Sequence, residues 1–250
     1  KVTVSDSDGP LLYADVEVRV PAREIEATFR NAVGLLSARG VAGTIRFDSD
    51  SGDQTIEKVR GRIVADTGSG DVEASDVGGS LRCDTGSGDC RITGFSGEDL
   101  TCDTGSGGVI VRGAKARKLS GDTGSGRVRA LDSDFEEFVA DTGSGDVELQ
   151  TRSVSRLRRV KADTGSGDVT LRLGPDASFE AIADQGSGDI TNRYADAQPI
   201  LKGKELLGWR RGNGTIRISV DTGSGDLILD PGRVSEGRGR SRRSGSNPSR

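Results

Sequence analysis

The chain contains no histidine and no methionine, and only 4% of its 250 residues are aromatic. Because histidine is the commonest general base and a frequent zinc ligand, its absence argues against hydrolases and zinc enzymes. Hydrophobic residues make up 32% of the chain, which is little for a single compact globule and favours an elongated body with a thin core. No apolar run approaches the roughly 20 residues that cross a bilayer, so we expect no transmembrane segment.

The two ends of the sequence are polar and charged. The chain starts at Lys1, and we expect that an export signal preceded it and was removed. Residues 232–250 contain six arginines and one glutamate among serines and glycines. With so little to bury, residues 231–250 are predicted to be a basic disordered tail. Arginine-rich segments bind polyanions without sequence preference, so we expect no specific nucleic-acid partner.

Glycine is abundant, with 38 residues, and much of it lies in a repeated phrase. The string DTGSGD begins at positions 66, 84, 141, 163 and 221, with near copies at 103, 122 and 184. Successive copies are 18, 19, 19, 19, 22, 21 and 37 residues apart, and FDSDSGD places Asp48 one period earlier. Such a period indicates a repeat fold. The last interval spans about two periods, which predicts a degenerate or looped-out coil near KGKELLGWRRGNG.

Apolar residues recur at constant distances from each motif aspartate. Three positions before it stand Ile45, Ile63, Leu81, Leu100, Leu119, Phe138, Val160 and Ile218. Six positions after it stand Val72, Cys90, Val109, Val128, Val147, Val169, Ile190 and Leu227. Alternate positions around both sets are apolar, which is the pattern of strands with one buried face. Each unit is therefore predicted to be a strand, a Gly-Ser-Gly bend and a second strand.

Two short strands cannot enclose a core, so successive units must stack. Propeller blades need about 40 residues, and an antiparallel meander does not require the same residue type in every second strand. We therefore predict an all-β fold, a single-stranded parallel β-helix (β-solenoid) with about 19 residues per coil. The predicted organisation is a leading strand or cap over 1–24 and the solenoid over 25–230. Residues 11–40 are expected to cover one end, and residues 193–216, with Trp209, the other.

The motif suggests specific roles at the bend. Glycine tolerates positive φ and close backbone approach, and an aspartate two residues ahead can accept hydrogen bonds from the bend amides. The threonines are expected to form a ladder of mutual hydrogen bonds. Stacked carboxylates require compensation by turn amides or by cations, and calcium is the alternative ligand. The calcium candidates are Asp66, Asp71, Asp84, Asp89, Asp141, Asp146, Asp163 and Asp168.

Three enzyme classes are disfavoured by the same pattern. An aspartic protease needs one pair of aspartates sharing a proton, whereas these copies form a line. GSGD lacks the Gly-Lys-Ser/Thr of a phosphate loop. A polysaccharide-active enzyme needs one distinguished carboxylate pair, which a uniform ladder does not offer. We therefore predict no catalytic and no cofactor-binding residues.

The three cysteines occupy the inward columns. Cys83 and Cys102 share one column, and Cys90 replaces the valine of another. They are interpreted as small buried hydrophobic residues, with a Cys83 to Cys102 bridge as the alternative.

The strand, TGSGDV, strand pattern, with VEVRVP at 16–21 and a copy about every 19 residues, resembles a bacterial family of β-strand repeat domains of unknown function, the putative adhesins. The resemblance covers roughly residues 11–230. It implies a usually right-handed parallel β-helix that is exported to the cell envelope.

From the pattern and the resemblance together we expect a non-enzymatic envelope or cell-surface module for adhesion, scaffolding or ligand sensing. Its partner would be a surface polymer or an envelope protein, contacted through repeated outward side chains. Those expected on the outer faces are Arg82, Arg91, Arg112, Arg129, Glu148 and Arg172.

Overall fold

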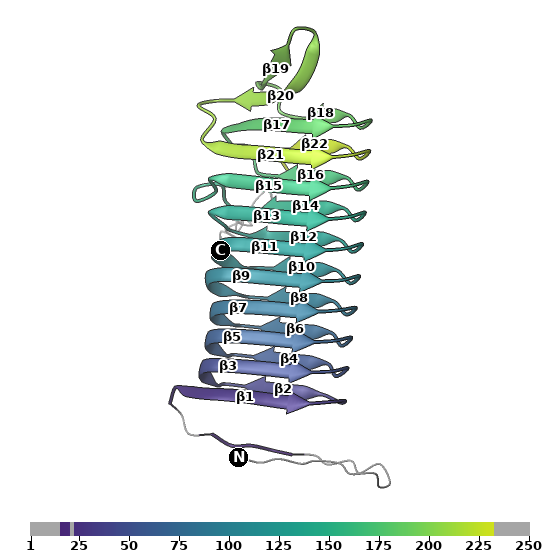
Figure 1. Ribbon diagram of the computed structural model, residues 1–250. Coiled ribbons are helices and arrows are strands. Elements are labelled where there is room, and N and C mark those ends of the chain that lie inside the picture. Colours follow the sequence, from purple (N-terminus) through teal and green to yellow (C-terminus); the bar gives the residue numbers. More distant parts are fainter. Residues whose placement is uncertain (1–15, 21–22, 233–250) are drawn as a thin grey trace, which may run out of the picture.

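A computed structural model describes residues 16–20 and 23–232 of the chain, and in this part every regular element is a β-strand. Figure 1 shows a rod of stacked coils, and each coil contributes one strand to each of two sheets. Of the predicted cap, residues 16–20 and 23–24 are described and contain no strand. Residues 1–15 and 21–22 of that cap, and the predicted tail from residue 233 onward, lie outside the described residues.

The first sheet has 12 strands in the order β1-β3-β5-β7-β9-β11-β13-β15-β21-β17-β20-β19. Its strands are β1 (Ile25–Asn31), β3 (Ala42–Ser49), β5 (Arg60–Thr67), β7 (Gly78–Thr85), β9 (Ser96–Thr104), β11 (Lys115–Thr123), β13 (Glu137–Thr142), β15 (Arg159–Thr164), β17 (Phe179–Gln185), β19 (Gln198–Lys202), β20 (Glu205–Arg211) and β21 (Ile216–Thr222). We call it sheet A.

The second sheet, sheet B, has 10 strands in the order β18-β22-β16-β14-β12-β10-β8-β6-β4-β2. Its strands are β2 (Leu36–Arg39), β4 (Gln54–Glu57), β6 (Val72–Ser75), β8 (Cys90–Thr93), β10 (Val109–Arg112), β12 (Val128–Ser133), β14 (Val147–Thr151), β16 (Val169–Arg172), β18 (Ile190–Asn192) and β22 (Leu227–Asp230). The motif bend joins a strand of sheet A to the next strand of sheet B. The predicted β-solenoid with about 19 residues per coil is therefore confirmed.

The inward columns form the core between the two sheets. The residues three positions before the motif aspartates are at most 3% exposed: Ile45, Ile63, Leu81, Leu100, Leu119, Phe138, Val160 and Ile218. Parallel register places each over its counterpart, so that Leu81 pairs with Ile63 on one side and with Leu100 on the other. Each such side chain contributes roughly 1.5–3 kcal/mol through its burial, and the ladder repeats that contribution in every coil.

The last coil in the sequence is not the last coil of the rod. Strand β21 lies between β15 and β17, with Asp221 paired to Asp163 on one side and to Asp184 on the other. The stretch that was expected to be a degenerate or looped-out coil forms an antiparallel hairpin, β19 and β20, and β20 pairs antiparallel with β17. The hairpin reverses the chain, which then returns to insert its final coil below β17 (Figure 1). The 37-residue interval is thus a reversal rather than a degenerate coil.

The two ends of the rod differ in how they are covered. As expected, residues 193–216 cover one end of the rod, because β20 of the β19–β20 hairpin pairs with β17 and Trp209 packs against the core. The expectation for residues 11–40 was wrong in part, since β1 and β2 already belong to the first coil and pair with β3 and β4. No described strand covers the outer edges of β1 and β2.

Candidate functional site

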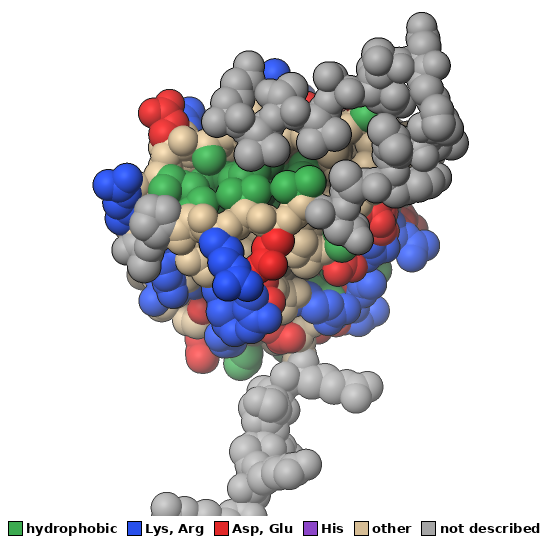
Figure 2. Space-filling model, turned by 90° about the horizontal axis from the view of Figure 1, so that it is seen from below, with side chains coloured by type: hydrophobic (Ala, Val, Ile, Leu, Met, Phe, Trp, Pro, Cys, Tyr) green, Lys and Arg blue, Asp and Glu red, His purple; other side chains and the backbone are tan. Residues whose placement is uncertain are grey.

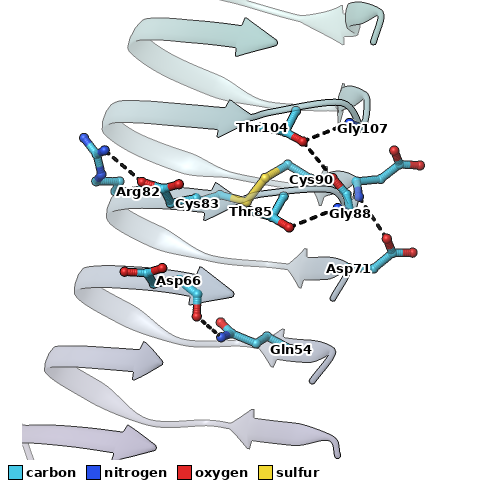
Figure 3. The surroundings of a disulfide bond; sticks show 12 residues. Gln54, Asp66, Asp71, Arg82, Cys83, Thr85, Gly88, Cys90, Thr104 and Gly107 are labelled. Atoms are coloured by element: carbon cyan, nitrogen blue, oxygen red, sulfur yellow. Dashed lines mark hydrogen bonds and ion pairs between the residues drawn. A yellow bond between two sulfur atoms is a disulfide. The ribbon is translucent and has the colours of Figure 1, made fainter. Parts of the chain in front are cut away.

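Threonine, placed just after each motif aspartate, organises the bend from inside. The Oγ1 atom of Thr85 accepts a hydrogen bond from the Gly88 N–H at 3.1 Å and donates one to the Gly70 carbonyl of the preceding coil at 2.9 Å. Thr104 repeats this with the Gly107 N–H and the Gly88 carbonyl (Figure 3). Each hydroxyl therefore closes its own bend and joins it to the bend below.

This geometry corrects two expectations about the motif. The hydroxyls bond to backbone groups of the bends, not to each other as a threonine ladder. The bend N–H is capped by Thr67 and its equivalents, not by the motif aspartate. Neighbouring residues of a strand point to opposite faces, so the buried Thr67 leaves Asp66 facing outward.

The bend glycines are required by close packing between coils. A Cβ atom on Gly88 would lie 2.0 Å from the Gly70 carbonyl oxygen, and one on Gly107 would lie 2.0 Å from that of Gly88. Neither residue has positive φ. Of the two expected reasons for glycine at the bend, close approach of backbone therefore applies here and left-handed conformation does not.

A second acidic column follows the bend and is satisfied by backbone. Asp71 Oδ1 accepts the Asp89 N–H at 2.8 Å, and Asp71 Oδ2 lies 2.6 Å from the Arg91 guanidinium. The Asp89 N–H and then the Arg91 side chain lower the pKa of the Asp71 carboxyl. The carboxylates that accept an N–H from the adjacent coil in this way are Asp53, Asp71, Asp89, Asp146, Asp168 and Asp226. Turn amides thus compensate this column.

The motif aspartates form a different column on the outer face of sheet A, which we call the aspartate stripe. In spatial order its members are Asp48, Asp66, Asp84, Asp103, Asp122, Asp141, Asp163, Asp221 and Asp184. Parallel strands lie about 4.8 Å apart, so one carboxylate follows another at that interval.

Only the N-terminal third of the stripe is neutralised by arginine. Arg46 contacts both Asp48 and Asp66, and Arg82 lies 3.0 Å from Asp84. From Asp103 onward, no member of the stripe forms an ion pair with any described residue. Six of the nine carboxylates of the stripe therefore have no ion-pair partner among the described residues.

The position of Asp122 within the stripe raises the pKa of its carboxyl. Burial raises the pKa of the Asp122 carboxyl, and the neighbouring carboxylates of Asp141 and Asp103 raise it further. Like charges in adjacent coils repel each other, which favours the neutral form of the middle group.

The calcium candidates are divided between these two columns. Asp66, Asp84, Asp141 and Asp163 lie in the aspartate stripe, whereas Asp71, Asp89, Asp146 and Asp168 accept backbone N–H groups beyond the bend. Within the described residues, no group of three or more acidic or cysteine side chains converges in a way that could hold a metal ion.

Two of the cysteines form a disulfide bond that the sequence interpretation missed. Cys83 and Cys90, seven residues apart, join β7 to β8 across the bend (Figure 3). Cys102 is free and buried, and burial raises the pKa of its thiol to about 12. The Cys83 to Cys102 alternative was therefore wrong. All three cysteines are buried, as the sequence suggested, but only Cys102 is an unbonded hydrophobic residue. The sequence could have predicted this bond. The residue one position before each motif aspartate faces the residue six positions after it, and only this coil has cysteine at both positions.

Most of the predicted outward arginines are already paired. Glu148 lies 2.7 Å from Arg129 and also contacts Arg172, and against the opposing effect of burial these guanidiniums lower the pKa of Glu148. Arg91 pairs with Asp71 and Asp89 in the same manner. Among the described residues, Arg112 forms no ion pair. On the outer face of sheet B, Arg91, Arg129 and Arg172 are therefore already occupied by carboxylates.

A shallow depression of about 560 Å³ lies where β15, β21 and β17 meet. Glu180 is the one carboxylate among its lining residues, and its Oε1 is 3.1 Å from Arg217 Nη1. A glycosidase-like mechanism needs two carboxylates facing one bond, so this lining does not support it.

One of three comparisons with known proteins found a match. The model of the Toastrack DUF4097 family matches residues 13–230. Comparison with curated proteins and comparison with solved structures each found no match. The described part of the chain has no helix with the length and apolar character that a membrane span needs.

Proposed function

The chain belongs to the Toastrack DUF4097 family of domains of unknown function, and on that premise we propose that it is a non-enzymatic adhesion and scaffold module. It acts outside the cytoplasm, in the cell envelope or on the cell surface. Its partner is a surface polymer with repeating positive charges. The observation that carries this proposal is the aspartate stripe, whose carboxylates from Asp103 onward are not paired with described residues.

The stripe is suited to many weak contacts rather than one strong one. An exposed ion pair contributes only about 0–1 kcal/mol. Carboxylates at intervals of about 4.8 Å engage a flexible polycation at several points, and linked contacts gain avidity through effective concentration. A repeating partner therefore exploits the coil repeat, whereas a small molecule uses only one or two coils.

The disulfide bond supports the extracytoplasmic location. Disulfides persist in oxidising compartments and are rare where thiols are kept reduced. Thiol trapping in intact cells tests this, because a protein in an oxidising compartment should show only the Cys102 thiol after denaturation. Three reactive thiols in protein taken directly from cells would contradict the location.

The binding proposal is tested with poly-lysine of graded length as the probe. We expect affinity to rise with polymer length and to fall steeply with salt. Replacing Asp103, Asp122 and Asp141 by asparagine should weaken binding by about 3- to 150-fold, from three contacts of about 0.2–1 kcal/mol each.

The matched control removes the same number of charges elsewhere. Asp50→Asn, Asp176→Asn and Glu205→Gln alter exposed acidic residues outside the stripe. This variant should bind nearly as tightly as the parent chain. Equal losses in both variants, or affinity independent of polymer length, would exclude the stripe as the contact surface.

A further inference from the structure

The N-terminal end of the rod exposes two strand edges and an apolar surface. Strands β1 and β2 are the outermost strands of their sheets at this end, and no other described strand pairs with their free edges. A cavity of about 900 Å³ lies here, lined by Phe29, Leu36 and Ala38 of the first coil and by Val18 and Val20. Figure 2 looks onto this end and shows hydrophobic side chains gathered there. Exposed edges of this kind favour aggregation unless another strand covers them.

The coil register identifies which residues match the free edge of β2. In the first coils every residue pairs with the one 18 positions further on, as Ile25 does with Gly43 and Leu36 with Gln54. Eighteen residues before Leu36 and Ala38 stand Val18 and Val20. Both would enter inward columns, where an apolar side chain is needed.

The residue between them also fits the register. Arg19 stands 18 positions before Ser37, and the column of Ser37 faces outward because Ser37 is exposed while its neighbours Leu36 and Ala38 are half-buried. Alternation of apolar and charged residues over 16–20 therefore matches the two faces of sheet B.

These valines are not yet buried where they lie. Val18 is 52% exposed and Val20 is 36% exposed, although both line the cavity. We propose that residues 18–20 of the same chain add to the free edge of β2 as the next parallel strand of sheet B. Val18 then covers Leu36, Val20 covers Ala38, and the strand closes the open end of the core.

The backbone pattern of sheet B specifies the bonds that this strand makes. The Leu36 N–H donates to the Asp53 carbonyl and the Gly40 N–H to the Glu57 carbonyl, so the even-numbered amides of this stretch face β4. In a parallel ladder alternate residues face opposite neighbours. The Ser37 and Arg39 amides therefore face the free edge, and in the closed state they donate to the carbonyls of Val18 and Val20.

Residue-resolved amide hydrogen exchange on the full chain tests the proposal. Closing predicts that the Ser37 and Arg39 amides exchange at least about tenfold more slowly than unstructured amides, which corresponds to about 1.4 kcal/mol in favour of the closed strand. The Val18→Asp, Val20→Asp double variant should return both amides to fast exchange. The Leu36 amide, bonded to β4, should stay protected and shows that the first coil remains folded.

The matched control is Arg19→Asp, which introduces the same side chain in the outward column. It should leave Ser37 and Arg39 protected. Fast exchange of both amides in the parent chain, or equal protection in the double variant, would overturn the proposal. Protection that rises with protein concentration together with dimer formation would also overturn it, because a second copy would then supply the strand.

Discussion

Replacing Thr104 by valine tests whether threonine holds the bends together. Thr104 is 1% exposed, and its Oγ1 donates to the Gly88 carbonyl at 2.9 Å and accepts the Gly107 N–H at 3.1 Å. Valine has nearly the same shape and can make neither bond. Both Gly88 and Gly107 are buried, so water does not easily replace the lost partner.

The expected loss follows from counting the unpaired groups. Each buried donor or acceptor left without a partner costs about 1–3 kcal/mol, so Thr104→Val should lower the free energy of unfolding by roughly 2–6 kcal/mol. Losses above about 4–5 kcal/mol are rare for single substitutions, so we expect the lower half of that range. The assay is equilibrium urea denaturation followed by circular dichroism, with midpoint and slope compared between variants.

Two controls separate the hydroxyl from other effects. Thr104→Ser keeps the hydroxyl and removes one methyl group, which should cost only about 1 kcal/mol. Thr101→Val makes the same chemical change on the outer face of the same strand and should stay within about 0.5 kcal/mol of the parent. If Thr104→Val unfolds at the same urea concentration as Thr101→Val, the inward threonines do not stabilise the bends.

Four further outcomes are expected. Gly88→Ala should prevent normal stacking, with a loss above about 3 kcal/mol in urea denaturation, since its Cβ would meet the Gly70 carbonyl at 2.0 Å. A loss comparable to that of Gly108→Ala, whose Cβ would meet nothing nearer than 3.4 Å, would contradict this. Asp122→Asn should raise the free energy of unfolding at pH 7 by less than about 1 kcal/mol. Because the pKa of Asp122 is raised in the folded state, this advantage should fade as the pH falls through that pKa towards 3.8. An advantage that grows on acidification would contradict the raised pKa. Reducing the Cys83 to Cys90 bond should lower the free energy of unfolding by about 2–3 kcal/mol, from the loop-closure entropy of this short loop. A variant with both cysteines replaced by alanine should not lose stability when reductant is added. Thermal melts with calcium and with chelator should coincide, because backbone amides already bind the second acidic column and, among the described residues, no three acidic side chains converge on one point. A rise of the midpoint with calcium would revive the calcium alternative.

The coil repeat is visible in the sequence for a physical reason. Parallel stacking in register places each residue over its own counterpart, so each column selects one kind of side chain. The columns through Leu81 and Val109 could therefore be assigned to the core from the repeat alone, and both are buried. The outward orientation of Asp66 could be predicted in the same way, because Asp66 neighbours an inward threonine.

The hydrogen-bonding roles of aspartate and threonine in the bend could be assigned only from the structure. Aspartate and threonine both accept hydrogen bonds, and both lie within reach of the bend amides along the chain. The atoms that actually meet are Thr85 Oγ1 and the Gly88 N–H, while the second carboxylate column serves the adjacent coil. The disulfide partner of Cys83 was likewise decided by which side chains face each other across the core.

By itself, the sequence determined the β-solenoid, the length of its coils and the residues of its core, because these depend on periods of two and about 19 residues along the chain. Only the tertiary structure decided the order of the last coils. The copies at 163, 184 and 221 have compatible inward columns, so the repeat alone does not distinguish one stacking order from another. The antiparallel pairing of β20 with β17 reverses the chain and places β21 between β15 and β17, and such pairing joins segments that no local period relates.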